Sequence, residues 1–353
     1  MSVPRELGYT RAMVLYDPLS HISLLDYGIL IPVAPDRSAR VVSELEVRLA
    51  ARGVSRDQWL VLPDPVEMKL DDILRAHSAE YTGRLYGTGL EQAILEAFEL
   101  IDDQGRPYRY APQQAVKTMS ELFTAFLQWC ARSYQAGVEA ISGDARYCYH
   151  LGGGGHHGHY DFGHGFCVVN DIVVAIRKLQ ADNGVRNAWV IDLDAHKGDG
   201  TAALTDGDDS IITLSIHMAS GWPLDLPDTC ADGKPHPSYV QSNYDIPIAA
   251  GEEHEYLPRL ESGLAALGAL GKPDIAYVIG GVDPYEHDGL PSTQDLRLTI
   301  DQLIARDRMT FDFLRERDIP QAWLMAGGYG ERAWEPYVPS IEYAVVRSLG
   351  LSL

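Results

Sequence analysis

Two aspartates and a histidine stand two residues apart directly after an apolar segment, in the order Asp192, Asp194 and His196. The preceding residues, Ala188–Ile191, have the apolar, partly β-branched composition of a strand. Side chains two apart on a strand point to the same side, so the three groups can face one site at its carboxyl end. Carboxylate oxygens with an imidazole nitrogen are ligands for a divalent transition metal, zinc first. A magnesium motif of the phosphatase type, or polar residues that only end a strand, are the alternatives.

Asp283 follows the apolar segment 275–279 and two glycines. It is therefore the candidate for a third ligand beside Asp194 and His196. Three protein ligands and a water molecule are typical of a catalytic zinc, whereas a structural zinc has four protein ligands. Asp288 lies five residues further along the chain. It can position a substrate or a helix, but a cap of its own turn is the favoured interpretation, because Asp side chains readily bond to turn backbones.

The adjacent histidines His156 and His157 follow four glycines at 152–155. Glycine lets the backbone approach a ligand closely, which can direct both rings into a crevice, although adjacent histidines also occur in cores and on surfaces. Each imidazole needs a carboxylate partner to fix its tautomer, and Asp192 and Asp199 remain for this role. A phosphate-binding loop is a weak interpretation, since the glycine run is not followed by the lysine or the ribose-binding acid that such motifs require.

Tyr329 follows Gly327 and Gly328 after the apolar segment 322–325. Its phenol can donate a hydrogen bond to an oxyanion. Tyrosines at strand ends more often only pack, because their amphipathic rings suit such boundaries. The presence of three other polar strand ends favours the catalytic interpretation here.

Apolar segments alternate with amphipathic ones along the whole chain, which predicts an α/β fold, a mainly parallel sheet flanked by helices on both faces. We expect strands at Ala12–Tyr16, Ala145–His150, Ala188–Asp192, Ile211–Ile216, Ile275–Ile279 and Ala322–Met325. We expect helices at Ser38–Ala51, Glu67–His77, Glu91–Leu100, Ala115–Ile141, Asp171–Ala181, Glu253–Leu267, Leu296–Glu316 and Ser340–Leu349. No repeat or long linker divides the sequence, so residues 1–353 are expected to form a single domain.

The polar groups lie at the carboxyl ends of the expected strands, which is where open α/β sheets bind ligands. Two long loops, Asp102–Pro112 and Ala219–Asn243, are candidates for the rim of such a site. Surface insertion is the alternative for both, because loops accept insertions readily.

Charge and composition limit the partners and the location of the protein. The formal net charge of −21 argues against nucleic acid as a direct partner, because binding phosphate requires basic patches. An acidic surface can attract cationic amines, but it also keeps a protein soluble. The four cysteines form no C-x-x-C pair, the chain begins without a signal pattern, and no apolar run reaches 18 residues. We therefore expect a cytoplasmic protein with reduced thiols and no membrane contact.

In combination, these motifs resemble those of the histone deacetylase family, which includes acetylpolyamine amidohydrolases and acetoin-utilisation proteins. The likeness runs from about Tyr16 to Tyr343, and its motifs stand in the family's order. They are His156-His157, Gly165-Phe166-Cys167-x-x-Asn170-Asp171, Asp192-x-Asp194-x-His196-x-Gly198-Asp199-Gly200, Gly281-x-Asp283 with Asp288, and Gly327-Gly328-Tyr329.

The resemblance implies an arginase–deacetylase fold with Zn²⁺ held by the three ligands already named. It implies catalytic roles for the two histidines, their carboxylate partners and the tyrosine, namely His156, His157, Asp192, Asp199 and Tyr329. His157 is expected to be the general base, and the pair His156–Asp192 to act electrostatically. Substrate contacts are implied for Gly165, Phe166, Trp222 and Gly327, and a K⁺ ion near Asp192 and Ser215.

One position departs from the family, because Lys197 stands where most members have a second histidine. The family pattern does not use this position as a metal ligand, so zinc binding is expected to persist. A cation there can change the electrostatics of a neighbouring pair, and with it the level and the pH dependence of activity.

These observations predict a zinc-dependent amidohydrolase that removes an acyl group, acetyl first, from an amine such as acyl-lysine or an acyl-polyamine. The alternative is a non-catalytic acyl-ligand or metal-binding protein that retains the fold. A two-manganese ureohydrolase requires a second set of bridging carboxylates and histidines, which the motifs do not supply. The long loops can narrow the entrance to the site or form a homo-oligomer contact.

Overall fold

In the part of the chain that the structure describes, a parallel sheet of eight strands forms the centre of the molecule. The computed structural model describes residues 13–18, 22–102, 104–230 and 233–352. The strand order is β2-β1-β3-β8-β7-β4-β5-β6, which confirms the predicted α/β fold. The strands are β1 (Val14–Leu15), β2 (Leu60–Val61), β3 (Tyr147–His150), β4 (Ala188–Asp192), β5 (Ile211–Met218), β6 (Tyr244–Ile248), β7 (Ile275–Ile279) and β8 (Gln321–Leu324).

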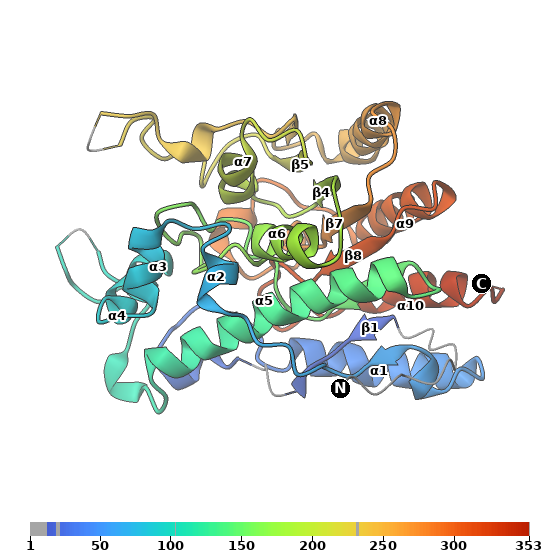
Figure 1. Cartoon of the computed structure of the whole chain (residues 1–353), viewed down its shortest axis with the longest axis horizontal. Helices are drawn as coiled ribbons and strands as arrows, with labels where there is room; N and C mark the ends of the chain where they lie inside the picture. The colour runs from blue at the N-terminus through green and yellow to red at the C-terminus, as the bar shows by residue number, and fades with distance from the viewer. Residues whose placement is uncertain (1–12, 19–21, 103, 231–232, 353) are drawn as a thin grey trace.

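Helices cover both faces of this sheet (Figure 1). Successive residues of β4 alternate between two apolar clusters: Trp189 and Ile191 pack in one, and Ala188 and Val190 pack in the other. Because both faces are buried, the central strands are apolar throughout, as parallel strands in α/β proteins usually are. One face packs against α5 (Met119–Ser142) and α6 (Asp171–Asp182), and the other against α1 (Arg37–Ala51), α8 (Tyr256–Ala269), α9 (Ile300–Glu316) and α10 (Tyr337–Ser348).

The other described α-helices are shorter: α2 (Leu70–Ile73), α3 (Ala79–Leu85), α4 (Leu90–Ala97) and α7 (Asp199–Thr205). The sequence analysis did not predict α3 or α7. The helix predicted over Glu67–His77 is wrong in extent, because only the single turn of α2 forms there. The helix predicted from Leu296 begins at Ile300 instead, where Thr299 and Gln302 form a capping box.

The edge strands β2 and β6 were missed by the sequence analysis. β2 has two residues, and β6 contains Asp245 and Pro247, which weaken an apolar strand pattern. Edge strands tolerate proline and charge because one side of their backbone needs no partner strand. Ala12, the first residue of the first predicted strand, lies outside the described residues.

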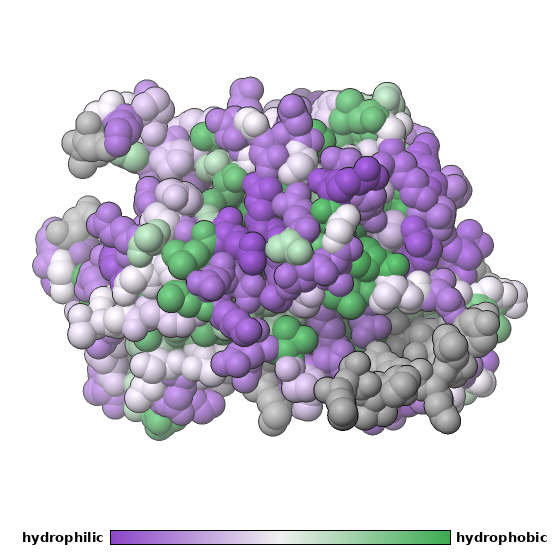
Figure 2. Space-filling model, viewed as in Figure 1, coloured by the Kyte–Doolittle hydropathy of each residue, from purple (hydrophilic) through white to green (hydrophobic). Residues whose placement is uncertain are grey.

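The face of the molecule in Figure 2 is mainly hydrophilic, with apolar residues in scattered patches. In the described part of the chain, no helix has both the length and the apolar character needed to span a bilayer.

Candidate metal and catalytic site

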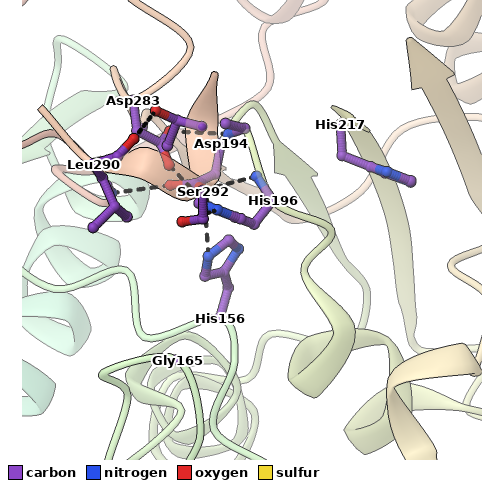
Figure 3. Close-up of polar contacts among 12 residues, drawn as sticks. His156, Gly165, Asp194, His196, His217, Asp283, Leu290 and Ser292 are labelled. Carbon is purple, nitrogen blue, oxygen red and sulfur yellow. Dashed lines mark hydrogen bonds and ion pairs between the residues drawn. The ribbon is translucent and has the colours of Figure 1, made fainter. Parts of the chain in front are cut away.

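The candidate metal ligands follow two neighbouring central strands. β4 and β7 pair in parallel, with Asp192 beside Ile279, so the segments that follow them leave the same edge of the sheet. The donor atoms of Asp194, His196 and Asp283 all lie within 4.8 Å of one another, and all three residues are buried. Figure 3 shows the three side chains gathered together, with the ring of His156 directed toward them.

Short contacts orient each of these donors. His196 Nδ1 lies 3.1 Å from Asp283 Oδ2 and 3.4 Å from Asp194 Oδ1. The second oxygen of Asp283 accepts a hydrogen bond from the Ala195 amide at 2.9 Å, and Asp194 Oδ2 accepts one from the Gly327 amide at 3.0 Å. A Cβ atom at Gly327 would overlap both carboxylates, so only glycine fits beside the site.

The electrostatics of these residues fit a bound divalent cation. Burial and the neighbouring Asp194 raise the pKa of Asp283 above its usual value. Burial also opposes ionisation of Asp194, yet His156 and His196 hold its pKa below the usual range. Two buried carboxylates this close repel each other, and a cation between them relieves that repulsion. The combination of two carboxylates with one imidazole is a donor set that Zn²⁺ accepts.

Arg306 connects the two segments that carry these ligands, and the sequence analysis missed it. This fully buried side chain on α9 donates from Nη1 to the carbonyl oxygens of Leu193 and Gly281, at 2.9 and 2.8 Å. It lies on the same buried face of α9 as the core residues Leu303 and Leu314, a position where an arginine is unexpected. A charged residue on an otherwise apolar helix face was the available signal.

Two histidine–aspartate pairs lie beside the metal ligands. His156 Nδ1 is 2.7 Å from Asp192 Oδ2, and His157 Nδ1 is 2.6 Å from Asp199 Oδ1. The two ring centroids are 3.9 Å apart, and all four residues are buried. Since both Nδ1 atoms face carboxylates, each ring has its Nε2 atom free of that pairing. His156 Nε2 is 3.6 Å from Asp194 Oδ1.

The two neighbouring histidines have pKa values that are displaced in opposite directions. Burial, and then the charge of His156, lower the pKa of His157 to about 3. Burial also disfavours the cation of His156, but Asp192 and Asp194 outweigh it and raise that pKa to about 9. A cation bound at Asp194 would lower the pKa of both histidines. His157 is therefore the neutral member of the pair.

The glycine loop before these histidines is fixed by Asp171, the first residue of α6. Its carboxylate accepts hydrogen bonds from the amides of Gly155 at 2.6 Å and Gly154 at 3.1 Å. The hydroxyl of Ser133 donates to the same carboxylate. Gly154 has a φ of +86°, which residues with side chains rarely adopt.

Asp288 caps its own turn, as the sequence predicts, and also positions Tyr329. One carboxylate oxygen accepts from the Leu290 amide at 2.8 Å, and the other from the Tyr329 amide at 2.7 Å. Burial, followed by the charges of Asp283 and Asp194, raises the pKa of Tyr329 well above its usual value. The phenol is therefore protonated at neutral pH and can act as a hydrogen-bond donor.

A cavity of about 160 Å³ lies over these residues. The predicted substrate residues Gly165, Phe166 and Gly327 line it, together with His156, His157 and Tyr329. Trp222 lies beside the catalytic pair, with its ring 4.6 Å from that of His157 and 5.4 Å from that of His196.

The two long loops differ in position. Ala219–Asn243 supplies Trp222, and also Ser238, whose hydroxyl donates to Asp199. This loop therefore contributes to the site. The loop Asp102–Pro112 instead contacts another surface segment: the carbonyl oxygen of Arg109 in the loop accepts a hydrogen bond from the Leu30 amide at 2.9 Å.

Lys197 is directed toward the edge strand β6. Its ammonium is buried and lies 3.2 Å from Asp245 Oδ2, and His217 Nε2 is 3.5 Å from the other oxygen of that carboxylate. His217 and Lys197 hold the pKa of Asp245 below its usual value, although burial raises it. The carboxylate of Asp245 therefore compensates the charge of Lys197. Ser215, implied as a K⁺ neighbour, pairs in register with Asp192.

Two further histidines near Asp199 were also missed. His159 Nε2 is 3.1 Å from Asp199 Oδ2, and His164 Nδ1 is 3.7 Å from the same oxygen. The available signal was two additional histidines within eight residues of the tandem pair.

Sequence comparisons with known proteins give a matching family model and several relatives. The sequence model of the histone deacetylase domain matches residues 31–342. The chain is 23% identical to histone deacetylase 2 of Arabidopsis thaliana over 337 residues, which cover 96% of this chain and 79% of the relative. It is 29% identical to the acetoin utilization protein AcuC of Bacillus subtilis over 195 residues, 55% of this chain and 49% of the relative. It is also 29% identical to an uncharacterized protein of Picosynechococcus over 180 residues, which cover 51% of this chain and 55% of the relative. The chain thus spans only about half the length of two of these relatives.

Proposed function

Because the chain belongs to the histone deacetylase family, we propose that it is a zinc-dependent amidohydrolase that removes an acyl group, acetyl first, from an amine. The observation that carries this proposal is the meeting of three buried donors, Asp194, His196 and Asp283, beside two histidine–aspartate pairs. We also propose that residues 1–353 form one catalytic domain, and that a K⁺ ion binds near Asp192 and Ser215.

The three donors would hold the zinc ion. When bound, zinc supplies Lewis-acid polarisation of the amide carbonyl and lowers the pKa of water from about 15.7 towards about 7. The protein residues around it supply the proton transfers and the hydrogen bonds that the reaction also needs.

His157 is the proposed general base. Its Nδ1–H donates to Asp199, at 2.6 Å, which places the lone pair of the neutral ring on Nε2. Nε2 takes a proton from the attacking water and then gives it to the amine nitrogen as the C–N bond breaks. The carboxylate of Asp199 stabilises the imidazolium between these two transfers.

His156 and Tyr329 are proposed to stabilise charge. Asp192 orients His156 and favours its cationic form, so His156 acts electrostatically on the developing oxyanion. Tyr329 donates its phenol hydrogen to that oxyanion from the cavity wall. Gly165, Phe166 and Trp222 are proposed to enclose the acyl chain and its linker.

The experiment is a deacylation screen on zinc-reconstituted protein with varied acyl groups and amines. Acetyl-lysine peptides are compared with acetylated putrescine and spermidine, which separates the two substrate classes. His157→Ala should lower kcat/KM by about 10²–10⁴-fold while its metal content stays that of the wild type. His254→Ala is the matched control, because that histidine is exposed on the surface. If the zinc-loaded wild type hydrolyses no acyl amide in the panel, a non-catalytic binding protein is the better description.

A further inference from the structure

A second set of metal donors lies on the far side of Asp199. The candidate donor atoms of His159, His164 and Asp199 all lie within 4.8 Å of one another. This set shares no residue with Asp194, His196 and Asp283. His159 and Asp199 are buried, and His164 lies at the margin of the site, with its side chain 13% exposed.

The spacing of these atoms suits a shared ion better than hydrogen bonds alone. His164 Nδ1 is 3.7 Å from Asp199 Oδ2, which is too long for a hydrogen bond. His159 Nε2 is 3.1 Å from the same oxygen. Two ligand atoms bonded tetrahedrally to one zinc ion at about 2.0–2.2 Å lie roughly 3.3–3.6 Å apart. Small movements of the side chains would therefore bring all three donors onto one ion.

His164 carries the strongest sign of a missing ligand. Among the described residues, its buried Nδ1 atom has no hydrogen-bond partner, and such an atom is costly to leave unpaired. Its other ring nitrogen, Nε2, lies 3.8 Å from Glu99 Oε1, which is within ion-pair distance but longer than a hydrogen bond. A histidine that binds a metal with one nitrogen commonly presents the other to a carboxylate, and this carboxylate orients the ring.

His159 is held in position for the same role. Its ring stacks on Phe162, with centroids 4.5 Å apart and an interplanar angle of 19°. Ser238 places a hydroxyl oxygen against Asp199 Oδ2 and can supply a fourth donor or bond a water molecule. Two imidazoles and a carboxylate favour zinc or a neighbouring transition metal over Mg²⁺ or Ca²⁺, which prefer oxygen ligands.

We propose that His159, His164 and Asp199 bind a second transition-metal ion, Zn²⁺ first. Its affinity is lower than that of the first site, because the ion must compete with the hydrogen bonds from His159 and Ser238 to Asp199 Oδ2. The two sites share no carboxylate, so the arrangement differs from a bridged two-manganese centre.

The second ion has a consequence that rests on the proposed function. Asp199 presents Oδ1 to His157 and Oδ2 to the second site. A cation on Oδ2 withdraws negative charge from the carboxylate that supports His157 as a base. Excess zinc should therefore inhibit amide hydrolysis after the first site has been filled.

The test counts metal ions and does not depend on activity. Metal-free full-length protein is titrated with Zn²⁺ by calorimetry, and bound zinc per chain is measured by mass spectrometry. The wild type should bind two equivalents in two separate steps, whereas His164→Gln and His159→Gln should each bind one. His254→Gln is the control and should bind two, and melting curves check that each variant is folded.

Glu99→Gln is a milder variant, because it retains all three proposed ligands. It should weaken the second step by about 10- to 100-fold and leave the first step unchanged. One equivalent in the wild type, or two unchanged steps in both histidine variants, would overturn the proposal. If the protein hydrolyses no amide, the number of zinc ions bound per chain still shows whether the second site exists. If the protein does hydrolyse amides, inhibition by excess zinc should be absent in His164→Gln.

Discussion

The Nδ1 atom of His157 lies 2.6 Å from Oδ1 of Asp199, and both side chains are buried. His157 comes from the loop after β3, and Asp199 is the first residue of α7. The contact joins two segments 42 residues apart and fixes which nitrogen of the ring can accept a proton.

Replacing Asp199 by Asn should lower kcat/KM by about 10- to 100-fold, because the ring loses the anion that orients it and stabilises its charged form. Steady-state deacylation of zinc-loaded protein measures the effect. Asp161→Asn, an exposed position in the nearby loop, should retain wild-type activity. An Asp199→Asn variant as active as the wild type would remove Asp199 from the mechanism.

Tyr329→Phe should reduce kcat by about 10²–10³-fold with little change in KM, because the lost hydrogen bond is made to the oxyanion and not to the ground-state amide. Zinc content should be that of the wild type, since the phenol is not a ligand. Tyr160→Phe is the matched control at a surface position, where the side chain is 56% exposed. A higher KM at unchanged kcat would instead assign Tyr329 to substrate binding.

Lys197→Met should destabilise the zinc-loaded protein by about 1–3 kcal/mol, because Asp245 loses the partner that compensates its charge. The double variant Lys197→Met/Asp245→Asn should recover part of that loss, since no unpaired carboxylate remains. Urea unfolding measures both, and zinc content is expected to stay unchanged. A double variant less stable than Lys197→Met would show that the ion pair is not the source of the effect.

His77 should make the fold sensitive to acid. Its Nδ1 lies 2.8 Å from the His159 carbonyl oxygen, and its Nε2 accepts from the Asn170 amide at 3.0 Å, so the folded protein holds the neutral ring. Burial lowers its pKa from 6.5 to about 4. Between these values the unfolded chain binds more protons, so the stability present above pH 6.5 is lost as the pH falls.

The expected loss from His77 between pH 7 and pH 5 is about 2 kcal/mol, at about 1.4 kcal/mol for each pH unit below 6.5. The measurement is the free energy of unfolding at both pH values for metal-free wild type and His77→Gln. The variant should lose less stability on acidification than the wild type, whereas His254→Gln should lose the same amount. Equal losses in His77→Gln and the wild type would contradict the assignment.

The central strands of the sheet and the candidate metal ligands could be predicted from local sequence patterns. The bounds of β4 and β7 agree with the predicted strands, because both are apolar on two faces, and β4 ends in Asp192 while two glycines follow β7. Asp194, His196 and Asp283 stand within four residues of those ends. Parallel strands end at the same edge of the sheet, so the sequence predicts that these side chains gather there; the tertiary structure adds that β4 and β7 are neighbours.

Which distant groups pair with the site depends on how separate segments of the chain pack. Arg306, the partner of the Leu193 and Gly281 carbonyls, lies in a helix that its pattern marks only as amphipathic. Asp245, which pairs with Lys197, lies on the edge strand β6. The sequence does not reveal this strand, because its aspartate and proline interrupt the apolar pattern. His159 and His164 meet Asp199 because loop packing over 40 and 35 residues brings them together. Such contacts depend on how separate segments pack, and no periodicity within either segment encodes them.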